Sequence, residues 1–64
     1  MPPKKKTGNI IIHLINRENA EVHTQEIYGI TIFRDKEEMR KYLHATVMTT
    51  VPSNILLLSY NEIK

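Results

Sequence analysis

The sequence predicts a small α+β fold, in which one helix covers one face of an antiparallel three-stranded sheet. Three observations support this prediction. Residues 10–15 and 55–58 are near-continuous aliphatic runs, which is the pattern of strands buried on both faces. Residues 36–50 carry apolar side chains at helical spacing, between a capping residue and a proline. The chain has 64 residues, which is close to the smallest size at which a single core supports itself.

The first two strands are expected to form a hairpin. Strand one would span residues 9–16, and strand two would span residues 20–33. The intervening residues 17–19 form a loop of three, and such a loop pairs even positions with even positions. Ile10, Ile12 and Leu14 would then share a face with the even-numbered residues of strand two. Gly29 predicts a bulge or a sharp bend in the long second strand, and a break into two strands is the alternative.

The helix has a clear start. Asp35 can cap it, and Glu38 follows three residues later, as in a capping box. Pro52 ends the helix by about Thr50, because the residue before a proline avoids helical geometry. The positions expected to face the sheet are Met39, Tyr42, Leu43 and Val47.

The element order is β-β-α-β, with the last strand at residues 54–60. If this strand lies beside the first, the spatial order of the strands is 2-1-3 and every pair is antiparallel. The most apolar strand is then in the middle of the sheet, where both of its faces are buried. One helix covers only one face, so the other face needs a second copy of the protein or a partner.

Charge divides the chain into two parts. The whole chain has nine Lys and Arg residues against seven Asp and Glu, a net charge of +2, and three of the basic residues are Lys4, Lys5 and Lys6. Residues 1–8 are therefore expected to be a flexible basic N-terminal arm, and residues 9–64 a single domain. There is no cysteine, which excludes disulfides and thiolate chemistry. The N-terminal sequence does not have the pattern of a signal peptide, so a cytoplasmic protein is expected.

Two histidines are the first candidates for a functional site. In the register given by a three-residue loop, His13 and His23 stand opposite each other on the face away from the helix. Opposed imidazoles can bind zinc or copper, but a third ligand is lacking. No metal or other cofactor is therefore expected, and the pair is interpreted as part of an interface. Enzymatic activity is not expected either, because the chain has no Gly-rich phosphate loop and is too short to enclose a pocket of convergent polar groups.

The leading interpretation is a small non-enzymatic protein-interaction module that docks through an open aliphatic sheet face. It would act as a homodimer, as an adaptor or as an inhibitor of the kind that phages encode. The partner-binding residues expected on that face are Ile11, His13, Ile15, His23 and Ile27.

Two alternatives remain open. One is a small nucleic-acid-binding protein, in which a basic arm and a basic helix face contact phosphates. The other is a subunit of a larger assembly. No membrane association is expected, because no apolar run approaches the ~20 residues that cross a bilayer. The residues of the nucleic-acid alternative are Lys4, Lys5, Lys6, Lys36, Arg40 and Lys41.

Overall fold

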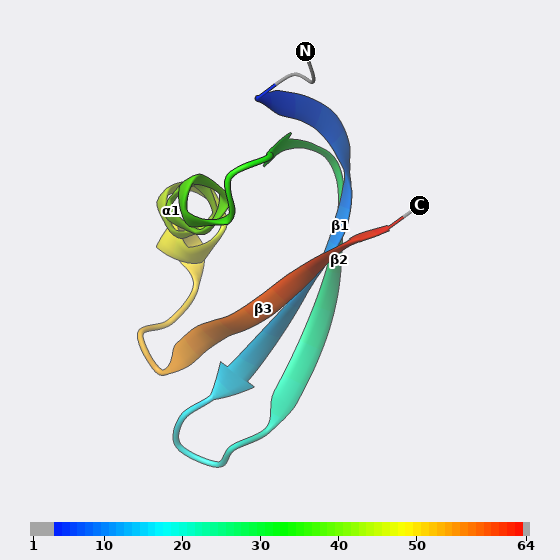
Figure 1. Ribbon diagram of the computed structural model, residues 1–64. Coiled ribbons are helices and arrows are strands. Elements are labelled where there is room, and N and C mark those ends of the chain that lie inside the picture. Colours follow the sequence, from blue (N-terminus) through cyan, green and yellow to red (C-terminus); the bar gives the residue numbers. More distant parts are fainter. Residues whose placement is uncertain (1–3, 64) are drawn as a thin grey trace.

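The computed structural model describes residues 4–63 and has the predicted α+β architecture. Three antiparallel strands form one sheet in the order β2-β1-β3, and the helix α1 packs on one face of it (Figure 1). The predicted element order and strand order are both confirmed. The elements are β1 (Lys5–Asn16), β2 (Val22–Phe33), α1 (Lys36–Thr46), the 3-10 helix η1 (Met48–Thr50) and β3 (Ile55–Ile63).

Strand β1 begins earlier than expected. Lys5 pairs with Phe33 and Gly8 pairs with Ile30, so residues 5–8 belong to the sheet. The backbone N–H of Arg34 also donates to the carbonyl of Lys4, at 2.8 Å. The predicted arm over residues 1–8 is therefore wrong for residues 5–8, and residues 1–3 lie outside the described part of the chain. The prediction was wrong because lysines at the end of a chain are typical of a solvated tail. Here the edge strand β2 pairs with them.

The hairpin loop has four residues rather than three. Ile15 pairs with Val22, and the backbone N–H of Asn16 donates to the carbonyl of Glu21 at 2.8 Å. The extra residue is Ala20, which closes the loop with a φ of +61°, in the left-handed region. Since one residue is added, odd positions of β1 pair with even positions of β2 near the hairpin. The predicted even-with-even register is wrong there.

A bulge at Gly29 restores the predicted register farther along the hairpin. The pairing shifts between Ile10 and Gly8, and beyond this point Gly8 pairs with Ile30. Gly29 adopts a φ of +68°, and its N–H donates to Asn9 Oδ1 at 3.1 Å. The bulge expected at this glycine is confirmed, and β2 is continuous through it. Past the bulge the hairpin curls toward α1, which brings Ile30 and Ile32 into the core (Figure 1).

The helix begins as predicted and ends sooner. The Asp35 carboxylate accepts a hydrogen bond from the N–H of Glu37 at 2.8 Å, which confirms the cap. The α-helix ends at Thr46, and residues 48–50 continue as η1 instead of as α-helix up to Thr50. Crowded β-branched residues disfavour the α-helix here, and the hydroxyls of Thr49 and Thr50 donate to the carbonyls of Thr46 and Val47.

The core lies between α1 and the sheet. Met39 and Leu43 are the buried residues of α1, which confirms two of the positions expected to face the sheet. Tyr42 and Val47 are partly buried against the same cluster, and the ring of Tyr42 packs edge-on against Phe33 with centroids 5.2 Å apart. The fully assembled core consists of Ile10, Ile12, Leu14, Ile30, Ile32, Met39, Leu43 and Leu57.

Candidate docking face

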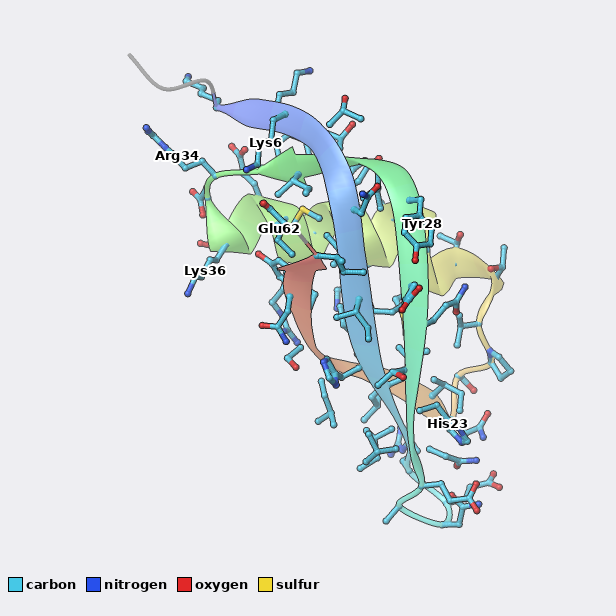
Figure 2. The ribbon with its side chains drawn as sticks, turned by 90° about the vertical axis from the view of Figure 1, so that its right-hand side faces the viewer. Lys6, His23, Tyr28, Arg34, Lys36 and Glu62 are labelled. Carbon is cyan, nitrogen blue, oxygen red and sulfur yellow. The ribbon has the colours of Figure 1, made fainter. Side chains whose placement is uncertain are left out.

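The sheet face opposite α1, which we call the open face, is formed by alternate residues of the three strands. Its centre is β1, which contributes Ile11, His13 and Ile15, while Ile10, Ile12 and Leu14 point to the helix. Within residues 4–63 no segment packs over this face (Figure 1). Figure 2 views the open face directly, with α1 behind the sheet. The single helix therefore leaves one side of a mostly aliphatic central strand without cover.

An apolar row crosses the hairpin end of the open face. Ile15 on β1 pairs with Val22 on β2 and with Leu56 on β3, so the three side chains share the face. Val22 is 55% exposed and Leu56 is 46% exposed. Leu58, at the point where the pairing of β1 with β3 shifts, is 49% exposed. Exposure of this kind on adjacent strands is typical of surfaces that contact another molecule.

The middle of the open face is polar. His13 pairs with Thr24 on one side and with Ser59 on the other. Its Nε2 lies 3.3 Å from the side-chain nitrogen Nδ2 of Asn61. An amide nitrogen donates, so this contact is a hydrogen bond when Nε2 carries no proton.

Between the hairpin and the Gly29 bulge, charge on this face lies at one edge. Ile11 pairs with Glu26 on β2 and with Asn61 on β3. Between the hairpin and the Gly29 bulge, Glu26 is the one described residue of the face with a formal charge at neutral pH. The hydroxyl of Tyr28 donates to the Glu26 carboxylate, and this hydrogen bond, with smaller contributions from desolvation and from the carboxylate charge, raises the pKa of Tyr28. The anion is thus held at the rim, beside a solvent-exposed ring.

Three of the five predicted partner-binding residues lie on the open face, namely Ile11, His13 and Ile15. The placement of the other two is wrong, because the four-residue loop turns each of them to the helix side. His23 pairs with Leu14, and its Nε2 lies 3.4 Å from a carboxylate oxygen of Glu21. Ile27 pairs with Ile10 and packs against the core.

The two histidines consequently do not form a pair across the hairpin. Thr24, not His23, is the partner of His13. No group of three or more side chains suited to hold a metal ion is found among residues 4–63. Val22 was also expected on the helix side, and the same one-residue error in loop length explains this. The sheet face on which Leu56 lies follows from strand alternation, since Leu56 is next to the buried Leu57.

Some of the predicted basic residues lie together at a different site, near the start of α1. Lys36 and Arg40 line an open groove of about 390 Å³ against the last half of β3. Arg40 Nη2 donates to the carbonyl of Leu57 at 3.3 Å, which fixes the guanidinium over the sheet edge. Lys6 Nζ lies 2.9 Å from Glu62 Oε1, and Figure 2 shows Lys6, Glu62 and Lys36 at the same end of the molecule. The remaining residues that line the groove are Ser59, Tyr60, Asn61 and Glu62.

Acidic side chains are interleaved with these basic ones. Glu62 accepts from Lys6, and Lys41 on the outer surface of α1 lies 3.9 Å from Glu37. A second, smaller groove of about 220 Å³ is lined by Lys4 and Arg34 together with Asp35 and Glu38. The end of the molecule therefore presents mixed charge rather than the continuous basic stripe typical of a nucleic-acid interface.

Comparison of the chain with protein-family models, with curated proteins and with solved structures gives no match. The described residues include no helix that is long and apolar enough to cross a membrane.

Proposed function

We propose that this protein is a small, non-enzymatic protein-interaction module that docks through its open face and acts in the cytoplasm. The observation that supports the proposal is the row Ile15, Val22 and Leu56, which is apolar across all three strands and lies on the side of the sheet that no described segment covers. Burying apolar surface releases about 25 cal/mol per Å², so such a row gains free energy when another surface covers it. The polar groups of the face, around His13, orient the partner rather than drive association.

Site-specific photo-crosslinking in the organism that encodes the protein tests this proposal. A photoreactive residue replaces Thr24, which is exposed and pairs with His13 on the open face. The matched control replaces Lys41, which is exposed on the outer surface of α1. We expect a discrete protein adduct from position 24 that disappears when Leu56→Lys is added, and no such adduct from position 41. Equal adducts from both positions, or an adduct at 24 that Leu56→Lys leaves intact, would contradict docking through the open face.

A nucleic-acid-binding function ranks second, and one observation favours it. The structure brings Lys6 of β1 to the end of the molecule that carries Lys36 and Arg40 of α1. Binding to phosphates through these residues would weaken steeply as salt is raised, because counterions are released. Titration of a fluorescent single-stranded oligonucleotide at 50 and 200 mM salt measures this. The association constant should fall at least tenfold between the two salt concentrations, and the double variant Lys36→Ala, Arg40→Ala should abolish binding. Both results together would favour this function over the first.

A further inference from the structure

We infer that the molecule that covers the open face is a second copy of this chain, which packs its own open face against the first in a symmetric dimer. This inference rests on the proposed function, because it names the occupant of the same face. It is carried by the distribution of exposed apolar side chains, by the charge of the face and by its area.

The exposed apolar side chains restrict which surface of a second copy could fit. The strongly exposed large apolar residues among residues 4–63 all lie on β2 and β3, and none lies on α1. The exposed residues of α1 instead include the charged side chains of Lys36, Glu37, Arg40 and Lys41. Among residues 4–63, a surface able to cover the row at Ile15 is therefore found only at the open face itself. Contact between two identical surfaces is isologous, and such a contact closes at two copies.

Charge on the open face agrees with self-contact. Two identical faces brought together repel each other if they carry a large charge of one sign. Here the face has one formal charge between the hairpin and the bulge, Glu26, on the edge strand β2. The central strand β1 carries only Ile11, His13 and Ile15 across the middle of the face. The two carboxylates therefore remain at the rim of a dimer, where water screens them.

The geometry of the sheet also agrees with face-to-face packing. Two sheets pack with their strands nearly aligned and about 10 Å apart. His13 lies midway between Ile11 and Ile15 along β1. When the two-fold axis runs along β1 between the two copies, the two β1 strands are parallel and each His13 faces the His13 of the second copy. The row Ile15, Val22 and Leu56 then lies against the same row, with Val22 of one copy over Leu56 of the other.

The area of the face is sufficient for a small dimer interface. β3, the shortest strand, has nine residues. A three-stranded face of that length is about 30 Å by 14 Å, or roughly 420 Å² in projection for each copy. Two such faces with protruding side chains bury about 1,000 Å² of accessible surface, the lower limit for a specific interface. An interface of this size is typical of weak, transient contacts, so the dimer exchanges with monomer.

Sedimentation equilibrium of the pure protein between about 5 and 500 µM tests this inference. Three variants add one positive charge each: Ile15→Lys at the centre of the face, Leu56→Lys on the edge strand, and Ala45→Lys on the exposed surface of α1 as the control. We expect wild type and Ala45→Lys to dimerise alike, and Ile15→Lys and Leu56→Lys to raise the dissociation constant at least tenfold. Leu56 is 46% exposed, so its substitution spares the core if Ile15→Lys unfolds, and circular dichroism checks both.

The outcomes separate this inference from the proposed function. A wild type that stays monomeric up to 500 µM overturns the second copy as occupant. If position 24 nevertheless gives an adduct of another mass, and Leu56→Lys removes it, docking through the face still stands. A dimer that forms equally well in Leu56→Lys and Ile15→Lys overturns the inference too, because it uses another surface.

Discussion

The two faces of the sheet are built from the same strands, yet they are covered differently. On the helix side, Ile10 and Ile12 are fully buried beneath Met39 and Leu43. On the open side, Ile11 and Ile15 alternate with them along β1 and remain partly exposed. Residues 4–63 supply apolar side chains for both faces but form only one α-helix. Isoleucines that α1 covers stabilise the fold. An isoleucine one position along the same strand lies on the open face and is available for association.

Truncation on the two sides of the sheet is expected to have unequal effects on folding. Leu43→Ala removes a side chain that is 1% exposed and opens a cavity, so the free energy of unfolding should fall by about 2 to 5 kcal/mol. Ile11→Ala, on the open face, should cost about 1 to 2 kcal/mol in the monomer, because its side chain is already partly hydrated. Urea unfolding at about 5 µM protein measures both. Equal losses would show that the open face is as important to the fold as the core.

The bulge that restores the register is expected to depend on glycine at position 29. Gly29 has a φ of +68°, and a Cβ added there would meet no atom within 4 Å. Gly29→Ala should therefore cost about 1 to 2 kcal/mol through backbone strain alone. Gly8→Ala is the contrasting variant. Its added Cβ would lie 2.6 Å from Cδ1 of Ile32, so this substitution disturbs side-chain packing and not the backbone conformation. Unfolding by urea measures the loss, and an unchanged stability of Gly29→Ala would contradict a strained bulge.

A charge on the open face is expected to weaken association, whereas the same charge on the helix side is not. His13 lies at the centre of the open face, between Thr24 of β2 and Ser59 of β3. His13→Lys places a positive charge there on each copy, so two like charges meet at the centre of the interface.

Dimerisation of His13→Lys should be weakened about fivefold or more, on the order of 1 kcal/mol. His23→Lys is the matched control and should dimerise like wild type, because His23 lies on the helix side. Sedimentation of the two variants provides the measurement. A loss of association that follows His23 instead of His13 would mean that the assigned register does not describe the dimer.

The smallest effect is expected at the N-terminal end of β1. Lys6 is 58% exposed and forms an ion pair with Glu62, and such surface pairs contribute about 0 to 1 kcal/mol. Lys6→Ala should therefore reduce the free energy of unfolding by less than about 1 kcal/mol, with the loss shrinking as salt is raised. Thermal unfolding at 20 and 500 mM salt measures it. A loss as large as that of Leu43→Ala would place this end of the strand in the folding core.

The fold was predictable because its strongest signals are periodic. The spacing of Met39 and Leu43 after the Asp35 cap identified the helix, and the run 10–15 identified the central strand. The register of the hairpin was not predictable, since it depends on whether Ala20 belongs to the loop or to the strand. Only its left-handed φ decides this, and alanine gives no sign of that conformation in a sequence.

Errors in the candidate site follow from that one residue. His23, Ile27 and Val22 moved to the opposite side of the sheet when the loop gained a position. Residues on the central strand escaped the error, because Ile11, His13 and Ile15 alternate with the buried set whatever the hairpin register. Pairing of Lys5 and Lys6 with β2 was missed for a different reason, since lysine has a low strand propensity and three in a row indicate a tail.

The most direct test of the division between the two faces is a series of ¹H–¹⁵N correlation spectra of the wild type, recorded as protein concentration rises from about 20 to 500 µM. Shifts that grow with concentration should be confined to amides of open-face residues, above all Ile11, His13, Ile15 and Leu56. Amides of α1 around Met39 and Leu43 should stay unchanged, because the helix is on the far side of the sheet. Shifts concentrated on α1, or no concentration dependence at all, would contradict the account.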